Sequence, residues 1–467
     1  MNVKSKHANV VTAVENALKP AMYVKGKPIA AMNILDRMKY YNVPGVSVAV
    51  IDNGEIAWAK GYGIKETSSN DPVTTETLFQ AASISKPVTA LGILRLVEKG
   101  ILDLDAPVND KLVSWKVPEN EFSEKEKVTL RHLLTHSAGL TVSSFPGYAA
   151  PEQIPTPVQV LDGEKPANTS PVRIDMIPGS AWRYSGGGFV VTQLLVADMS
   201  GGSFQEYMQT TVLAPLEMNH STFEQPLPQE KVDQAVSGHQ VNGEAVQGKW
   251  HVYPELAAAG LWTTPSDLCR FAIELQKSVA GESNKVISQE MALKMLAPGI
   301  GGWGLGMGLG ASREEEKRSF SHGGGNKGFV CMLFAFVNKG QGAVIMTNSD
   351  NGNELVFEIL RALSSVYGWS ILEPREMVLV EIAPEKLISY TGDYRAADEP
   401  DTPVVVYIEK DQLHIMSSET GDWALSPISE TEFVYMDGGV VLTFIKGNDD
   451  RYDQIQRWGS VLSRKNG

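Results

Sequence analysis

Cysteine is scarce in this chain of 467 residues, and its scarcity removes two classes of protein. The chain holds two cysteines, Cys269 and Cys331, and no C-x-x-C pair. A small fold held by a disulfide framework is excluded, and so is a cysteine-rich zinc module. We expect both residues to be reduced thiols in a hydrophobic core, and a single disulfide between them is the alternative.

Basic charge and long apolar runs are also lacking. Lys and Arg number 41 against 55 Asp and Glu, which gives a net charge of −14 without any long basic block. Such a surface repels phosphate groups, so we expect no nucleic-acid partner and no anionic membrane surface as a partner. No stretch reaches the roughly 20 continuous apolar residues that a membrane-spanning helix needs. We therefore expect no membrane span.

The composition that remains is that of a globular protein, with 43% apolar and 21% charged residues. At roughly 100–200 residues per domain, it predicts two or three domains. Residues 1–27 begin with basic side chains, but Glu15 and Lys19 interrupt the apolar segment that a secretory signal requires. We expect a cytoplasmic protein, or a periplasmic or secreted one if a signal peptide has been removed.

Strand patterns occur at both ends of the first 370 residues. Residues 46–51 and 55–61 flank Asp52-Asn53-Gly54, the strongest hairpin signal in the chain, and residues 329–337 and 343–347 form a second hairpin pattern. Helical patterns lie between them. The arrangement predicts an α+β domain whose sheet joins strands from the two ends of the domain.

Other segments give further expectations. Residues 28–41, 86–99 and 353–366 are predicted helices, and Gly100 is a candidate C-terminal cap of the second one. Residues 140–180 are rich in proline and predict a long surface excursion of the kind that covers a site. Residues 302–310 alternate glycine with apolar residues, which favours a flat strand over a nucleotide-binding loop.

The pattern changes after about residue 375, where helical periodicity stops. Short strand patterns then follow one another between turn residues, and they predict a small closed barrel as a separate all-β module. We predict two domains, residues 1–375 and residues 376–467. The predicted barrel strands are residues 404–409, 412–417, 423–426, 432–436, 440–446 and 452–458.

One Ser-x-x-Lys motif, Ser83 to Lys86, stands at the start of a predicted helix. Residues three apart lie on one helix face, so the amine can reach the hydroxyl. The helix N-terminus stabilises a developing oxyanion, and serine needs an adjacent base to act as a nucleophile. A lysine is such a base only where its pKa is lowered by several units. The motif alone carries little weight, because it also arises by chance.

Two further motifs are rich in glycine. Tyr184 precedes Ser185 and three glycines, a pattern equally typical of a core tyrosine before a turn. His322 precedes Gly323, Gly324 and Gly325 just before a strand, where a hydrogen-bonded structural histidine is the alternative. If functional, these glycines let the strand backbone lie against a substrate, with an N–H directed at an oxyanion.

Taken in this order, Ser-x-x-Lys, Tyr-x-Gly and His-Gly-Gly resemble the motifs of the serine β-lactamase and penicillin-recognising hydrolase superfamily. The resemblance is greatest to the class C β-lactamase-related serine hydrolases, which include D-aminopeptidases, DD-peptidase homologues and related esterases. Residues 130–140 and 254–262 resemble segments that frame the site in this family. The resemblance covers roughly residues 28–366, and the β tail is similar to the lipocalin-like C-terminal modules of some D-aminopeptidase-type members.

The resemblance implies a β-lactamase/transpeptidase-like fold, an antiparallel sheet flanked by helices. It implies that Ser83 is the nucleophile, that Lys86 is its base partner and that Tyr184 carries the proton to the leaving group. Whether Lys86 or Tyr184 is the ground-state base stays open. It also implies an oxyanion hole from the backbone N–H groups of Ser83 and Gly325. The resemblance further implies a set of residues that bind the substrate or the oxyanion, which are His322, Gly323, Gly324, Gly325 and Gly186.

The chain departs from the family pattern at two positions. Gly186 replaces the asparagine of Tyr-x-Asn, and His322-Gly323 replaces Lys-Thr of Lys-Thr-Gly. The fixed cation and hydroxyl that bind a carboxylate are therefore absent, and such contacts contribute about 2–3 kcal/mol. An imidazole with an ordinary pKa near 6.5 would gain charge only as the pH falls toward 6. We expect substrates without a carboxylate beside the scissile bond.

These observations leave several alternatives for function. A peptidase or amidase acting on D-amino-acid-containing or short peptides comes first. A carboxylesterase, or a penicillin-binding sensor or scaffold with little turnover, is the alternative. His132 and His136 have the spacing of zinc ligands, but Leu133 stands where H-E-x-x-H has glutamate, so we expect no metal and no cofactor. The partner is a small-molecule or short peptide substrate, and the C-terminal module is a candidate for gating or homo-oligomerisation.

Overall fold

The computed structural model describes residues 3–312, 314–396, 402–417, 421–447, 451–457 and 460–465, in two compact units. One unit contains Val43–Gln240 and Glu244–Gly352, and the other contains Met1–Asn42, Val241–Gly243 and Asn353–Gly467. The domain boundary after residue 375 stays a prediction. None of the helices in the described ranges combines the length and the apolar character that crossing a bilayer requires.

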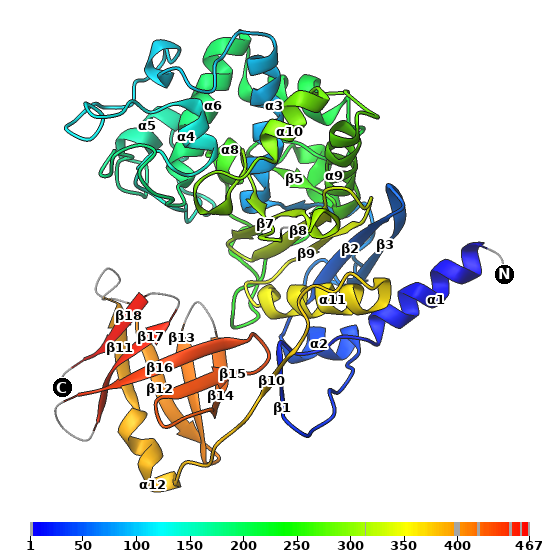
Figure 1. Ribbon diagram of the computed structural model, residues 1–467, viewed down its shortest axis with the longest axis vertical. Helices are drawn as coiled ribbons and strands as arrows, with labels where there is room; N and C mark the ends of the chain where they lie inside the picture. The colour runs from blue at the N-terminus through cyan, green and yellow to red at the C-terminus, as the bar shows by residue number, and fades with distance from the viewer. Residues whose placement is uncertain are drawn as a thin grey trace. The chain divides into compact units, whose positions relative to one another are not determined.

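The unit that carries the three motifs is built on a six-stranded antiparallel sheet (Figure 1). Strand β2 pairs with β9, so that Val46 lies opposite Thr347 and strands from both ends of the unit meet in one sheet. This confirms the predicted α+β class and both hairpins. In sheet order the strands are β3 (Glu55–Gly63), β2 (Gly45–Asp52), β9 (Gly342–Thr347), β8 (Phe329–Phe336), β7 (Ser319–Asn326) and β6 (Gly308–Leu309).

The α-helices of this unit lie in the chain between β3 and β6. Helix α9 packs against strands β2 and β9, and it is bounded by Thr264, whose side chain accepts from the Asp267 N–H, and by Gly281 in the left-handed conformation. The others lie together beside the sheet (Figure 1). The helices are α3 (Ser85–Glu98), α4 (Leu130–Leu134), α5 (Pro157–Asp162), α6 (Gly186–Ser200), α7 (Phe204–Met208), α8 (Leu256–Ala259), α9 (Pro265–Ala280) and α10 (Gln289–Met295).

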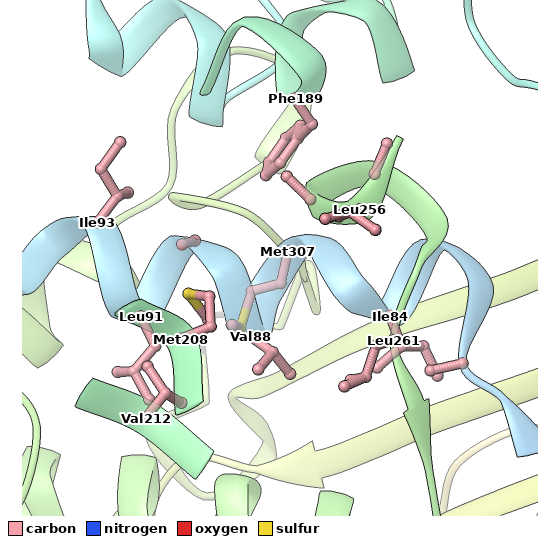
Figure 2. Close-up of a cluster of buried hydrophobic side chains, with 14 of the residues drawn as sticks. Ile84, Val88, Leu91, Ile93, Phe189, Met208, Val212, Leu256, Leu261 and Met307 are labelled. Carbon is pink, nitrogen blue, oxygen red and sulfur yellow. The ribbon is translucent and has the colours of Figure 1, made fainter. Parts of the chain in front are cut away.

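Helix α3 passes through the middle of this core. Figure 2 shows its side chains Val88 and Leu91 among apolar residues of neighbouring elements, including Met208. A Cβ added to Gly92 would lie 2.7 Å from the sulfur of Met208, so the glycine permits the close approach of the two elements. Most side chains of α3 are buried on every side of the helix, so the packing around it holds it in place. The start of α3 is therefore a rigid place for a reactive side chain.

The second unit contains a closed barrel, as predicted. Its strands are antiparallel and number eight, two more than the six that the sequence predicted. The barrel closes where β11 pairs with β18, with Tyr394 opposite Arg464. Trp458, the last residue of the predicted strand 452–458, lies outside the described residues. The strands are β11 (Gly392–Ala396), β12 (Val404–Glu409), β13 (Gln412–Ser417), β14 (Gly421–Pro427), β15 (Glu432–Tyr435), β16 (Val440–Lys446), β17 (Tyr452–Arg457) and β18 (Ser460–Arg464).

The remaining elements of this unit come from both ends of the chain. Strands β1 and β10 pair in parallel, which joins an N-terminal segment to the segment that precedes the barrel. The predicted helix 353–366 is confirmed as α11. These elements are α1 (Val3–Glu15), β1 (Met22–Val24), α2 (Ile34–Tyr40), α11 (Gly352–Tyr367), β10 (Arg375–Met377) and α12 (Pro384–Leu387).

Two local predictions and one alternative interpretation need correction. The predicted helix 28–41 begins only at Ile34, because the Asn33 side chain accepts from the Leu35 N–H and caps it there. The predicted strand 302–310 is wrong except at β6, because Gly302 and Gly306 adopt positive φ and bend the chain. The glycines after Tyr184 form the first helical turn of α6 and not a loop.

Candidate active site

Ser83 lies in a single 3-10 turn, Ala82–Ile84, directly before helix α3. The preceding residue, Ala82, has φ 48°, a left-handed conformation that is strained for a residue with a Cβ. The Ser85 hydroxyl secures the turn, donating to the Ala82 carbonyl at 2.6 Å and accepting from the Leu261 N–H at 3.0 Å. These bonds hold the half-buried Ser83 in a fixed place above the core.

Lys86 is the side chain that Ser83 contacts. It is 2% exposed, and its Nζ lies 3.0 Å from Ser83 Oγ and 2.8 Å from the Ala258 carbonyl oxygen on helix α8. No carboxylate forms an ion pair with it among the residues that the structure describes. Burial without a counter-ion lowers the pKa of Lys86 to about 7. A neutral amine beside a hydroxyl is an arrangement suited to removing its proton.

Tyr184 is the third member of this cluster. It directly precedes Ser185, the residue that caps helix α6. The Lys86 Nζ lies 5.0 Å from the centre of the Tyr184 ring. Burial raises the pKa of Tyr184 to about 12, and a hydrogen bond with Ser83 acts in the opposite direction. The phenol is therefore protonated at neutral pH, so it is a proton donor while Lys86 is the stronger candidate for the base.

The glycines of strand β7 have different surroundings. A Cβ on Gly324 would lie 2.3 Å from the Ala81 carbonyl oxygen and 2.5 Å from Cys331 Sγ, so only glycine lets β7 lie against the turn that carries Ser83. A Cβ on Gly323 would meet the Met332 side chain at 3.6 Å, an ordinary contact. A Cβ on Gly325 would have no atom within 4 Å. The chain thus leaves space at Gly325, next to a closely packed Gly324.

His322, on the same strand, is neutral. It is 5% exposed, and its Nδ1 lies 2.6 Å from the Gly323 carbonyl oxygen, which identifies Nδ1 as the protonated nitrogen. Burial, with a smaller contribution from Lys86, lowers the pKa of His322 to about 3. The expectation that this imidazole gains charge as the pH falls toward 6 is therefore wrong, because the sequence does not reveal its burial.

Gly186, the fifth residue assigned to the substrate-binding set, lies in the buried first turn of α6. Its N–H donates to the Ser143 carbonyl at 2.9 Å, and a Cβ there would lie 2.9 Å from the Phe145 ring. The structure thus gives this glycine a packing role, and its N–H is already bonded within the protein. A direct contact of Gly186 with substrate stays a prediction.

Aromatic rings surround Tyr184, and sequence reasoning did not assign them to the site. The ring centre of His136 lies 4.2 Å from that of Tyr184, and Trp303 lies 6.2 Å from Tyr184 and 5.5 Å from His322. Trp182 lies 5.5 Å from Trp303 and is partly exposed. His136 lies in segment 130–140, and the resemblance of that segment to the family could have indicated that the residue is near the site. For Trp303 the sequence offers no comparable indication, because its neighbours are glycines.

The structure also bears on metal binding. Within the described residues, the side chains that come close enough to share a metal ion are Glu409, His414 and Asp422, on the barrel strands. His132 and His136 do not belong to that group. The imidazole of His132 instead accepts from the Thr129 N–H and caps helix α4.

Known proteins that are similar to this chain share its fold. Penicillin-binding protein 4* of Bacillus subtilis (strain 168) is 26% identical over 439 residues, which is 86% of this chain and 90% of that protein. The octameric penicillin-binding protein homologue from Pyrococcus abyssi superposes with a TM-score of 0.60 at 24% identity, covering 92% of this chain and 98% of that one. The D-amino acid amidase from Ochrobactrum anthropi SV3 gives 0.59 at 21% identity, covering 77% and 99%.

A model of one protein family matches most of the chain. The match runs over residues 31–367, which includes all three motifs and the whole six-stranded sheet, and the model is described as Beta-lactamase. The solved structures show the same fold at low identity. The chain belongs to the beta-lactamase family.

Proposed function

We propose that the protein is a serine hydrolase that cleaves amide bonds through an acyl-enzyme, with D-amino-acid amides and short D-amino-acid-containing peptides as its substrates. The observation that carries the proposal is the contact of Ser83 with a buried lysine that has no counter-ion. A lysine with a pKa of about 7 is neutral in a large fraction of molecules at physiological pH. It supplies the base that a serine nucleophile needs.

The proposed reaction uses each group once in each half. The Ser83 oxygen attacks the carbonyl carbon while its proton passes to the Lys86 amine. Tyr184 donates its proton to the leaving nitrogen, the carbon–nitrogen bond breaks, and Lys86 returns a proton to the phenol. Water then attacks the acyl-enzyme along the same proton path in reverse. The space at Gly325, on a strand packed against the Ser83 turn, supports an oxyanion site formed by the N–H groups of Ser83 and Gly325.

The surroundings of His322 support the substrate class. A β-lactam or a C-terminal D-Ala-D-Ala carries a carboxylate next to the scissile bond, and this site presents a neutral imidazole there instead of a cation. With the proton held on Nδ1, its Nε2 offers a lone pair, and this buried atom has no hydrogen-bond partner among the residues that the structure describes. A lone pair suits a substrate N–H or ammonium group, which fits an aminoacyl amide. The fold likeness to a D-amino acid amidase is consistent with this class.

A carboxylesterase is the second candidate, and the aromatic lining favours it. Trp182 and Trp303 offer apolar ring surface around Tyr184, the ring that lies beside Ser83 and Lys86. Apolar acyl chains bind such surface without any polar partner. An ester also has a better leaving group than an amide and makes less demand on Tyr184.

The decisive experiment is a parallel assay with p-nitrophenyl esters, D- and L-amino-acid p-nitroanilides and a chromogenic cephalosporin. We expect turnover of D-aminoacyl anilides above that of the L-forms and weak turnover of the cephalosporin. Ser83→Ala should abolish turnover and also the single adduct that a fluorophosphonate leaves in intact mass spectrometry. Ester turnover without any anilide turnover would select the carboxylesterase. An adduct that persists in Ser83→Ala would refute the serine mechanism.

A further inference from the structure

His136 is hydrogen-bonded to both chain neighbours of Tyr184. The Arg183 N–H donates to the His136 carbonyl oxygen at 2.8 Å, and the Ser185 N–H donates to the His136 Nδ1 at 3.1 Å. One residue therefore binds the backbone on each side of the tyrosine, through its main chain on one side and its side chain on the other. Displacing His136 would release both bonds at once.

The imidazole of His136 also packs on the tyrosine itself. The two ring centres are 4.2 Å apart with an interplanar angle of 35°, a closer approach than His136 makes to Phe189 at 5.5 Å or Trp303 at 5.3 Å. The residue is 1% exposed, so these neighbours leave it little freedom to move. The ring of Tyr184 is therefore located by the same side chain that locates its backbone.

The imidazole must be neutral to make the bond to Ser185. Its Nδ1 accepts a hydrogen bond, so the single proton of the neutral ring lies on Nε2. Burial, then the charge of Lys86 and the presence of His322, hold the pKa of His136 well below its ordinary value of 6.5. The acceptor is thus available over the working pH range.

The backbone of His136 is in the left-handed conformation, with φ 55°. Residues with a Cβ adopt this conformation at a cost of order 1–3 kcal/mol, and such strain concentrates at functional sites. Glycine adopts it freely, and histidine is, with asparagine and aspartate, among the residues enriched in it. Glycine and asparagine would supply no aromatic ring, so at this position they would lose the ring contact with Tyr184.

We infer that His136 is a positioning residue for the reaction, which fixes the Tyr184 hydroxyl beside Ser83 and Lys86 by holding the tyrosine's backbone on both sides and its ring face. The inference rests on the proposed function, in which Tyr184 carries a proton. His136 itself contacts neither the substrate nor the reacting atoms in this scheme. Its effect is on the placement of a catalytic group, where a displacement of about 1 Å changes a rate by roughly 100-fold.

Two substitutions separate the contributions of His136 without adding backbone strain. His136→Gly removes both the acceptor and the ring, and His136→Asn replaces the acceptor at Nδ1 with an amide oxygen but removes the ring. With a D-aminoacyl p-nitroanilide as substrate, whose leaving nitrogen needs the proton of Tyr184, we expect His136→Gly to lower kcat roughly 10- to 100-fold with KM changed little. His136→Asn should recover part of this loss. His132→Asn, on the same segment but away from Tyr184, should keep wild-type kcat.

A double-mutant cycle with Tyr184→Phe distinguishes positioning from general structural support. If His136 acts through the tyrosine hydroxyl, His136→Gly should lower the residual rate of Tyr184→Phe less than about twofold, because no hydroxyl remains to be placed. Equal fractional losses in the two backgrounds, or wild-type kcat in a folded His136→Gly protein, would overturn the inference. If His136→Gly does not fold, the same cycle with His136→Asn gives the same discrimination.

The proposed function and the positioning role fail in different ways. If the proposed function is wrong, turnover and fluorophosphonate labelling should survive in Ser83→Ala. If only the positioning role is wrong, the effects of the His136 and Tyr184 substitutions should be additive in an enzyme that still requires Ser83. The labelling rate of each variant, measured alongside turnover, reports the acylation half-reaction directly.

Discussion

The Nζ of Lys86 lies 3.0 Å from Ser83 Oγ and 2.8 Å from the carbonyl oxygen of Ala258, and the amine is buried with no carboxylate partner in the described structure. The Ala258 carbonyl accepts one N–H of the amine and so fixes its position. The other positions on the nitrogen are then available to Ser83. In the neutral form one of these is a lone pair. Desolvation, the cause of the lowered pKa, thus also leaves the lone pair available to the serine.

This relationship predicts the pH dependence of the enzyme. A base must be deprotonated, so kcat/KM for a neutral ester should fall as the pH drops below about 7, the pKa of Lys86. Lys86→Arg keeps a cation that never deprotonates and should be inactive at every pH up to 9. Lys65→Arg, outside the site, is the matched control and should behave as wild type. An acid limb near pH 4 to 5 would instead identify a carboxylate as the base.

Tyr184→Phe removes the phenol while keeping the ring that His136 packs against. We expect a loss of roughly 10²–10⁴-fold in kcat, the range for one general acid–base group, with no loss of thermal stability. Tyr207→Phe is a matched control, because the Tyr207 hydroxyl donates to the Gly92 carbonyl and is hydrogen-bonded with Thr211. Near-wild-type kcat in Tyr184→Phe would show that Tyr184 is a core residue without a chemical role.

His322 predicts how the enzyme treats carboxylate-bearing substrates. Because burial lowers its pKa to about 3, the imidazole stays neutral between pH 6 and 8, and the cephalosporin-to-ester ratio of kcat/KM should be constant over that range. His322→Lys should shift this ratio toward the cephalosporin by up to about tenfold, the value of one partly solvated charge-assisted bond. His322→Gln, which stays neutral, should not. A wild-type ratio that rises toward pH 6 would show that the imidazole does become charged.

A buried ionic cluster predicts that cutting the chain after residue 375 lowers its stability. Arg37 donates to both oxygens of Glu358, at 2.9 and 2.7 Å, and to Asp437 at 3.1 Å, within the unit that contains the barrel. Removing residues 376–467 leaves the cation without Asp437, and we expect the fragment to unfold at a lower temperature than the full chain. Asp437→Asn in the full chain should lower the unfolding free energy by about 1–3 kcal/mol.

The exposed barrel residue Asp422 supplies the control for that experiment. Asp422→Asn changes a carboxylate that is 41% exposed and should leave the unfolding free energy nearly unchanged. A fragment of residues 1–375 with the melting temperature of the full chain would support the boundary that the sequence predicts. It would also show that the Asp437 contact adds little to stability.

The sequence predicted the features that local patterns determine. Alternating apolar residues and the Asn53-Gly54 turn were sufficient for the first hairpin, and Ser83 and Lys86 were found because a helix start places residues three apart on one face. Helix α6 could not be predicted from local preference, because Gly186, Gly187 and Gly188 disfavour helix. Ser185 caps that turn, and complete burial in the core stabilises it.

Other features depend on residues that are far apart in the sequence. The imidazole of His136 reaches Tyr184, 48 positions later, only after the chain has folded, and neither residue indicates the other in a one-dimensional pattern. The pKa values of Lys86 and His322 depend on burial, which composition does not specify. Strands β11 and β18 were missed because both are short and neither shows a clear alternation of apolar and polar residues.

Glu255 gives the last prediction, because it is a carboxyl buried without a partner. It is 0% exposed, neither side-chain oxygen has a hydrogen-bond partner within the described ranges, and burial raises its pKa from 4.5 to about 8. The folded chain therefore holds this proton at pH values where the unfolded chain has released it. The stability that the protonated group contributes is fully present below pH 4.5 and is lost as the pH rises through 8.

Glu255→Gln keeps the shape of the side chain and removes this titration. Its unfolding free energy relative to wild type should rise between pH 5 and pH 9, by an amount on the order of several kcal/mol at about 1.4 kcal/mol per pH unit between the two pKa values. Lys86 titrates in both proteins, so its effect cancels in the difference. Glu282→Gln, at an exposed position, should show no such trend. Urea denaturation at four pH values measures the difference, and parallel stability curves for wild type and Glu255→Gln would show that Glu255 is ionised in the folded protein.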